Sequence, residues 1–246
     1  MRNMSYGYGK YISVAEKKDK AIKSFNKLKK KNPDIEPIII KGRKLARTWW
    51  GEAWNNNLES YSDYSNRLPR GRNYVRHRAI LDLKIYPKKI TGIVQGSRSK
   101  PYQVEIDIVA LAKSKWEKVS KFCEGKIESL EKLIEGKFPE ELADIFTAQG
   151  EGLFPSPDEI DFNCSCPDYA SMCKHIAAIL YGVGSRLDED PTLFFTLRDV
   201  NIDELISKAV NQKTDTLIKK SNKKSNRVID EEDISAMFDI DLNTDD

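Results

Sequence analysis

Four residues close together in the sequence have the side chains that zinc prefers. Cys164, Cys166, Cys173 and His175 follow the pattern Cys-x-Cys, six residues, Cys-x-His, and they include three of the chain's four cysteines. Three thiolates and one imidazole complete a tetrahedral zinc shell and leave no coordination position for water or substrate. The spacing therefore predicts one structural Zn²⁺ ion and favours a binding function over a catalytic one.

Two other interpretations of the cysteine cluster stay open at this point. The cysteines could be small buried residues with His175 hydrogen-bonded nearby, or they could form a redox-sensing thiol group. The clustering argues against the first interpretation, and a histidine two residues after a cysteine adds nothing to disulfide exchange. Zinc binding is the favoured interpretation.

The residues around the cluster predict how it is held. A short strand is expected at 160–162 and a turn at Pro167-Asp168. Ser171 is the expected N-cap of an apolar helix over 172–181, which Gly182 and Gly184 should end. A strand, a turn and the first turn of a helix would then supply all four ligands.

Motifs for catalysis are missing from the sequence. There is no His-Glu-x-x-His, no Gly-x-x-x-x-Gly-Lys and no Gly-x-Ser-x-Gly. With His175 assigned to zinc, His77 is the one remaining imidazole, and a surface position is expected for it. We therefore expect no enzyme and no small-molecule substrate, with an undetected hydrolase as the remaining alternative.

A second segment combines arginines with tyrosines, which is typical of nucleic-acid-binding surfaces. Guanidinium groups bind phosphates and aromatic rings stack on bases. The segment is expected to be an ordered loop that enters a strand. Its arginines could instead form a solvated basic face or pair with carboxylates of the second half. The candidate contacts are Arg67, Arg70, Arg72, Tyr74, Arg76 and Arg78.

The net charge of +3 conceals two halves of opposite sign. Residues 1–100 contain 24 Lys and Arg against 8 Asp and Glu, whereas residues 101–246 contain 17 against 30. This asymmetry indicates a polyanion partner for the first half and a masking or docking role for the second. Mutual neutralisation of the two halves within the fold is an equally good interpretation.

Hydrophobic periodicity predicts an α+β fold. Apolar and polar residues alternate over 81–85, 90–95 and 102–108, so an antiparallel three-stranded meander with helices is expected. A mostly helical region carrying a small strand–turn–helix zinc unit should follow. A short buried strand is expected at Ile38 to Ile40. Helices are predicted at 14–31 and 44–60, as two or three segments over 109–148, and at 191–197 and 202–210.

Composition divides the chain into three parts. Residues 1–110 are expected to form a basic α+β region, and residues 111–210 a helical region with the zinc finger at about 155–185. Residues 211–246 read as a polar linker and an acidic tail, expected to be disordered. No membrane span or secretory signal is expected, and cysteines clustered for metal fit a reducing compartment, which predicts a cytoplasmic location.

Three stretches resemble stand-alone prokaryotic SWIM zinc-finger proteins. The most specific is 162–184, which begins Phe-Asn-Cys-Ser-Cys-Pro-Asp-Tyr-Ala-Ser-Met-Cys-Lys-His. Thr48-Trp-Trp-Gly-Glu-Ala-Trp54 and Asn66-Arg-Leu-Pro-Arg-Gly-Arg-Asn-Tyr-Val-Arg76 add support. The resemblance implies a zinc-chelating, non-catalytic module whose ligands are the four residues of the cluster.

The same resemblance implies partners. SWIM domains are proposed to bind DNA or proteins and occur in Swi/Snf-class helicase-like ATPases and in transposases, and the stand-alone forms are linked with such ATPases. We therefore expect a non-catalytic accessory protein that binds nucleic acid and a helicase-like ATPase. DNA is the expected type of nucleic acid. The alternative is a protein–protein interaction adaptor that makes no contact with nucleic acid.

Overall fold

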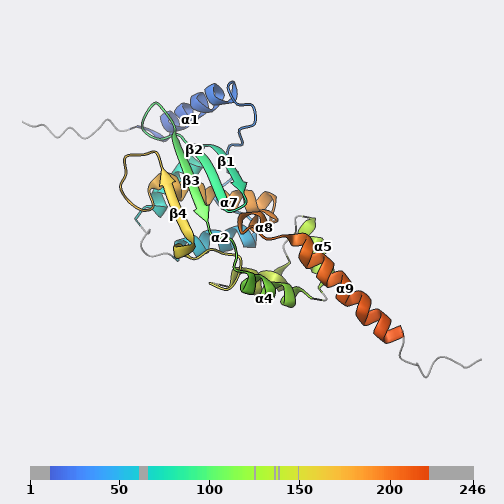
Figure 1. Ribbon diagram of the computed structural model, residues 1–246. Helices are drawn as coiled ribbons and strands as arrows, with labels where there is room; N and C mark the ends of the chain where they lie inside the picture. The colour runs from blue at the N-terminus through green and yellow to red at the C-terminus, as the bar shows by residue number, and fades with distance from the viewer. Residues whose placement is uncertain are drawn as a thin grey trace, which may run out of the picture.

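A four-stranded antiparallel sheet forms one layer of the molecule (Figure 1). The computed structural model describes residues 12–221 except 61–65, 125, 136, 138 and 149. The predicted α+β class and the predicted meander are confirmed, and the short strand that enters the zinc motif joins the sheet beside the third strand. The strands are β1 Ile80–Tyr86, β2 Lys89–Val94, β3 Tyr102–Ile108 and β4 Ile160–Cys164, in the order β1-β2-β3-β4.

The pairing of β3 with β4 fixes the position of the first zinc ligand. Ile106 lies opposite Phe162, and Val104 lies opposite Cys164. The ladder continues for one more residue, because the Ser165 N–H donates to the carbonyl of Gln103 at 3.0 Å. The end of β4 is therefore held at a defined place on the sheet. It also follows that the predicted regions 1–110 and 111–210 contribute strands to the same sheet.

Helix α7, Lys174–Glu189, lies across the inner face of the sheet and is buried over most of its length. A helix that is apolar on nearly every side belongs in a core. The prediction that it ends at Gly182 and Gly184 is wrong, because the helix continues through both. A Cβ added at Gly182 would lie 2.7 Å from Leu83, and one at Gly184 would lie 2.7 Å from Asn55. Both glycines are thus close-packing positions inside the helix.

Helices α2, Trp49–Glu59, and α3, Leu68–Arg76, pack against α7. Trp54 of α2 is buried and donates from Nε1 to the carbonyl of Leu180 at 2.8 Å, so it is a core residue. Gly71 allows α3 to approach α7 closely, since a Cβ there would lie 2.7 Å from the Cβ of Ala177.

The arginine–tyrosine segment was expected to be a loop, and that prediction is wrong from residue 68 onward. Leu68, Gly71 and Val75 are buried at helical spacing, and Pro69 lies in the first turn, where its missing N–H costs nothing. The arginines between the buried positions hid this apolar stripe. Tyr61 and Tyr64, which extend the segment in the sequence, lie outside the described residues.

The remaining helices surround this core. Helix α1, Val14–Lys29, starts with a capping box between Ser13 and Glu16. A second group lies at the other end of the molecule (Figure 1). It includes α4 Lys113–Cys123, α5 Ile127–Ile134 and α9 Ile202–Ser221. Helix α8 Leu193–Leu197 packs against β1 and α7. Helix α6 Ala143–Thr147 and the short 3₁₀ turns Glu140–Leu142 and Pro157–Glu159 complete the described helical segments. No helix in the described part of the chain has both the length and the apolar character that a bilayer crossing requires.

Two further predictions are corrected by the structure. Residues 211–221 were expected to be part of a linker, but they continue α9. They contain no Gly or Pro, and their Lys, Gln and Leu residues are good helix formers. The segment from Ile38 to Ile40 is not a regular strand, although the Ile38 N–H donates to the carbonyl of Ile80 at 3.3 Å. Residues 222–246 lie outside the described residues.

Candidate metal centre and adjoining basic surface

The structure brings the four predicted ligands together. Cys164 ends β4, Cys166 follows in the turn, and Cys173 and His175 lie at the start of α7. Their ligand atoms all lie within 4.8 Å of one another, and His175 Nδ1 is 3.9 Å from Cys164 Sγ and 3.8 Å from Cys173 Sγ. Zinc bonds of about 2.3 Å to sulfur and about 2.0 Å to nitrogen place tetrahedral donors at similar separations. The cluster fits one structural zinc ion bound through Nδ1 of the histidine.

The surroundings of Cys173 at the start of α7 lower the pKa of its thiol. Helix α7 begins at Lys174, so Cys173 is the N-cap, and the prediction that Ser171 caps the helix is wrong. A hydrogen bond from the Cys164 thiol lowers the pKa of Cys173 to about 3, and hydrogen bonds from His175 and from backbone N–H groups of the first helical turn act in the same direction. The same bond raises the pKa of Cys164. Cys173 is thus the thiol that ionises first.

Aromatic rings hold the imidazole of His175 in place. The Tyr102 ring lies 4.5 Å from it at an interplanar angle of 32°, and the Tyr74 ring contacts it edge-on at 5.2 Å. Its Nε2 atom is buried and has no hydrogen-bond partner among the described residues. A Cβ at Gly96 would lie 3.0 Å from this atom. Packing therefore orients the ring and leaves Nδ1 facing the sulfurs.

An ion pair fixes the turn between the ligands. Asp168 accepts from Arg67 Nη2 at 3.2 Å and from the N–H of Ala170 at 3.3 Å. Both charged side chains are largely buried. Arg67, a predicted nucleic-acid contact, thus joins the start of α3 to the zinc turn.

Helix α3 separates the other predicted nucleic-acid contacts. Arg72 donates from Nη1 to Glu59 at 2.6 Å and to the Tyr181 hydroxyl at 2.9 Å. Arg76 is exposed on the same side of the helix, where it borders a hollow that Arg72 and Glu59 also line. Arg78 is exposed beyond the helix end, with a φ of 58°. Arg70 and Tyr74 lie on the other side of the helix.

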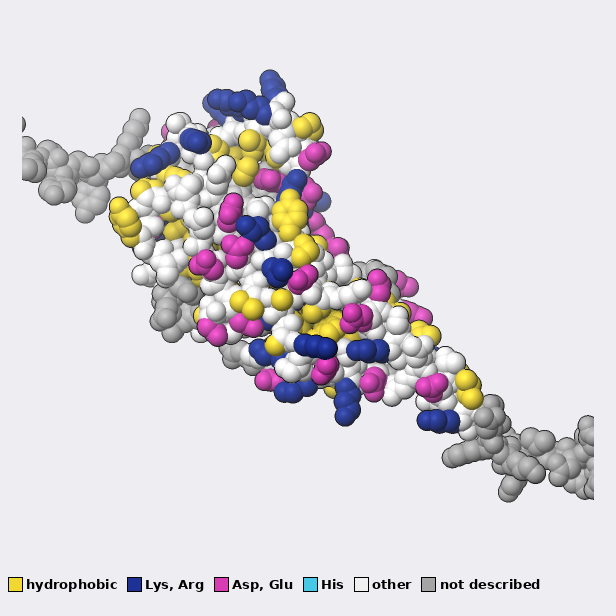
Figure 2. Space-filling model, in the orientation of Figure 1, with side chains coloured by type: hydrophobic (Ala, Val, Ile, Leu, Met, Phe, Trp, Pro, Cys, Tyr) yellow, Lys and Arg dark blue, Asp and Glu magenta, His cyan; other side chains and the backbone are white. Residues whose placement is uncertain are grey.

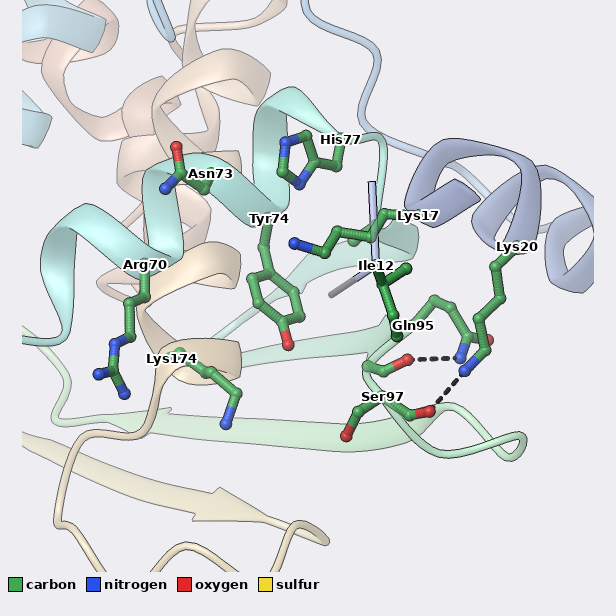
Figure 3. A pocket seen from close by; sticks show the side chains of 12 residues that line it. Ile12, Lys17, Lys20, Arg70, Asn73, Tyr74, His77, Gln95, Ser97 and Lys174 are labelled. Atoms are coloured by element: carbon green, nitrogen blue, oxygen red, sulfur yellow. Dashed lines mark hydrogen bonds between the residues drawn. The ribbon is translucent and has the colours of Figure 1, made fainter. Parts of the chain in front are cut away.

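Arg70 and Tyr74 line a cavity of about 260 Å³ between α1, α3, the start of α7 and the β2–β3 loop, which we name the Tyr74 pocket (Figure 3). Figure 3 shows Lys17 reaching toward the Tyr74 ring from one side, with Arg70 and Lys174 on the other. None of the described residues that line the pocket is acidic. The charged, aromatic and amide side chains of the lining include Lys17, Lys20, Arg70, Tyr74, Gln95 and Lys174.

The lysines and the glutamine of the Tyr74 pocket were not predicted as binding residues. Lys17 and Lys20 come from α1 and Lys174 from α7, and Gln95 is the first residue after β2. The three-residue spacing of Lys17 and Lys20 places both on one side of a helix, which is a weak signal in the sequence. Their convergence with Arg70 and Lys174 arises from contacts between distant segments.

The cations around the pocket act on its titratable groups. Burial, followed by the charges of Lys17, Lys18 and Arg76, lowers the pKa of His77, which also lines the pocket. Burial, followed by the neighbouring Tyr102 and two zinc-ligand thiols, raises the pKa of Tyr74. His77 therefore lies in a positive environment and is part of the pocket wall, a position that the sequence did not indicate.

A second hollow continues along the same helix. It has a volume of about 420 Å³, and we name it the Lys31 groove. It is lined by Lys27 of α1, by Lys31 in the turn that follows α1, and by Lys100 and Pro101 of the β2–β3 loop. Its described lining residues likewise include no acidic side chain. In Figure 2, Lys and Arg side chains gather over α1, at the top of the view, whereas charges of both signs mix elsewhere on that face.

Comparisons with known proteins support the assignment of the four-residue cluster as a zinc site. Residues 156–183 match the family model of the SWIM zinc finger. The chain is 37% identical over 172 residues to the uncharacterized protein Rv2102 of Mycobacterium tuberculosis, an alignment that covers 70% of this chain and 62% of that protein. The chain thus spans less than two thirds of that relative's length. No solved structure matches the chain. The strand, the turn and the helix that hold the four ligands therefore form a SWIM zinc finger.

Proposed function

We propose that this chain is a non-catalytic zinc-binding accessory protein that binds nucleic acid. The observation that carries the proposal is the set of cations in the Tyr74 pocket beside the zinc cluster. In the described part of the chain, Lys17, Lys20, Arg70 and Lys174 form no ion pair with a carboxylate. Four such charges around one hollow repel one another, and an anionic ligand removes that cost.

The zinc centre supports a structural role for the metal. All four donors come from the protein, so a bound zinc ion has a full tetrahedral shell. The ion would fasten the end of β4 to the start of α7 and thereby hold Lys174 and His175 in place. His77 is the second imidazole of the chain, and it faces cations, an environment that makes it a poor general base.

Nucleic-acid binding can be tested with the full chain and labelled oligonucleotides. We expect single-stranded DNA, single-stranded RNA or duplex DNA to bind with an affinity that falls steeply between about 50 and about 200 mM salt, because phosphate contacts release counterions. Fluorescence anisotropy gives both the dissociation constant and the salt slope. Absence of binding to every oligonucleotide at low salt would refute the proposal and leave the adaptor interpretation.

The absence of catalysis needs its own assay. The same labelled oligonucleotides, incubated with Mg²⁺ or Mn²⁺ and with a chelator as control, should remain intact on a denaturing gel. Chelator-sensitive cleavage by the purified chain would contradict a non-catalytic role.

We further propose a helicase-like ATPase of the Swi/Snf class as the protein partner. The support is the family resemblance, since stand-alone SWIM proteins are linked with such ATPases. Affinity purification from the native host followed by mass spectrometry should recover such an ATPase, and treating the lysate with nuclease separates a direct contact from bridging by DNA. Recovery of other proteins but no ATPase would contradict the choice of partner.

A further inference from the structure

We infer that the Tyr74 pocket receives one unpaired nucleotide of a single strand whose backbone continues along α1 over the Lys31 groove. This inference rests on the proposed function and specifies its ligand. It combines three features of the described residues: cations on both sides of a tyrosine, a buried hydrogen-bond acceptor without a partner, and a second basic hollow on the same helix.

The cations lie on two sides of the Tyr74 ring. Lys17 reaches toward the ring from α1, whereas Arg70 and Lys174 come from α3 and α7 (Figure 3). Lys20, also on α1, points to the β2–β3 loop, where its Nζ atom donates to the carbonyl of Ser97 at 2.5 Å. A ligand that satisfies both sides carries negative charge at two separated places. Consecutive phosphates of a nucleic-acid strand flank each nucleoside in this way, and lysine and arginine are the usual phosphate contacts.

Gln95 shows that the ligand needs a donor as well as an anion. The side chain is 4% exposed, and its Nε2 atom donates to the carbonyls of Gly96 and Arg98 at 2.9 and 2.8 Å. Both donors of the amide are thus used, which fixes its orientation. The Oε1 atom is buried and has no hydrogen-bond partner among the described residues. A buried acceptor left unpaired is costly, and a phosphate cannot pair with it.

A nucleobase supplies the missing donor. Every base has an N–H group on its Watson–Crick edge, and an aromatic side chain such as Tyr74 offers a surface for its ring. In a duplex these N–H groups are already paired and the bases are stacked inside the helix. The Gln95 acceptor therefore favours an unpaired base over a duplex.

The Lys31 groove indicates a polymer as the ligand. It lies along the same helix as the Tyr74 pocket and borders the same β2–β3 loop. Lys27, Lys31 and Lys100 form no ion pair with a carboxylate in the described part of the chain. A pocket of about 260 Å³ is below the roughly 300–1,000 Å³ typical of small-molecule sites, which suits one unit of a longer strand.

The test compares two double variants that lose the same charge. Lys17→Ala/Arg70→Ala removes one cation from each side of the Tyr74 pocket. Arg43→Ala/Arg76→Ala removes two exposed arginines from the hollow that Glu59 lines, and one of them is on the same helix, α3. None of the four residues forms an ion pair with a carboxylate in the described part of the chain. Both variants should keep the wild-type melting temperature and zinc content.

We expect the pocket variant to bind a labelled single strand of about twelve nucleotides roughly tenfold more weakly, with a salt slope reduced by about 2. The matched control variant should change the affinity much less. Wild-type protein should also bind the single strand more tightly than the corresponding duplex, and more tightly than an oligonucleotide of equal length without bases.

Three other outcomes would contradict either the single-strand inference or nucleic-acid binding itself. Equal affinity for the oligonucleotide without bases would reduce the pocket to a phosphate site. A preference for duplex, or equal losses in the two double variants, would also refute the inference while leaving nucleic-acid binding intact. No binding of any oligonucleotide to the wild type would refute the proposed function itself.

Discussion

The two sides of helix α3 carry the same type of side chain in opposite electrostatic settings. On one side, Arg72 is held by Glu59 and the Tyr181 hydroxyl. On the other, Arg70 shares the Tyr74 pocket with lysines of α1 and α7, and no acidic residue is found in the described lining. The two sides differ in their neighbours: Arg72 faces α2, whereas Arg70 faces the start of α7, where Cys173 and His175 lie.

This difference shows that an arginine's role depends on whether a carboxylate pairs with it, more than on the residue type itself. Arg70 and Arg72 are two positions apart, and nothing in their local sequence distinguishes them. An exposed ion pair contributes about 0–1 kcal/mol to stability, but it cancels the charge that a phosphate would meet. The unpaired side of α3 is accordingly the better candidate for binding an anion.

The largest expected effect comes from removing a zinc ligand behind the Tyr74 pocket. Cys173→Ser keeps a residue that caps helices well but removes one thiolate from the shell. We expect a loss of about 4 kcal/mol or more in the free energy of unfolding and a fall of roughly 10 °C in melting temperature. Thermal unfolding and metal analysis measure both effects. Oligonucleotide binding should fall as well, because Lys174 and His175 belong to the same turn.

Cys123→Ala is the control for this prediction. Burial raises the pKa of Cys123 to about 11, so this thiol stays protonated, and it lies outside the ligand cluster. Its replacement should cost about 1 kcal/mol and leave the zinc content unchanged. An equal loss of stability in the two variants, or normal zinc content in Cys173→Ser, would contradict a structural zinc site.

An intermediate effect on oligonucleotide affinity is expected from removing the carboxylate that pairs with Arg72, which makes this side of α3 resemble the side that faces the Tyr74 pocket. Glu59→Gln removes the carboxylate that neutralises Arg72 while keeping an acceptor for Tyr181. We expect oligonucleotide affinity to rise roughly two- to fivefold and the salt slope to increase by about 1, as measured by anisotropy. Glu117→Gln on α4, exposed and without an ion pair in the described structure, makes the same change in net charge elsewhere. Equal increases in both variants would show that net charge alone matters.

The smallest expected effect is the pH dependence of oligonucleotide affinity that arises from His77 in the Tyr74 pocket. The pKa of His77 is lowered by burial and by nearby cations, so its imidazole is neutral near pH 7. A bound phosphate raises that pKa, so binding takes up a proton and should tighten as the pH falls from about 7.5 to about 6. One added charge is worth about 1 kcal/mol, which corresponds to a roughly fivefold gain in affinity. His77→Gln should abolish the added gain, and an unchanged pH profile in that variant would exclude His77 from the site.

The elements predicted most accurately are those with strong local patterns. The strands at 81–85 and 102–108 alternate with period two, and they appear as β1 and β3. Predictions failed where a residue serves a distant contact. Gly182 and Gly184 are typical helix terminators, but here they lie inside α7 because Leu83 and Asn55 approach too closely for a Cβ. Arginines concealed the apolar stripe of α3 in the same way.

The zinc ligands follow from a local sequence pattern, whereas the basic pocket depends on contacts between distant segments. The four ligands lie within one short segment, and their side-chain chemistry specifies the metal, so the sequence by itself determined that centre together with the strands and the α+β class. Only the tertiary structure decided which cations are free of carboxylates and that residues 17, 70, 95 and 174 meet around one hollow. The physical reason is that charge pairing and burial depend on contacts between segments far apart in the chain, and periodicity within one segment does not record them.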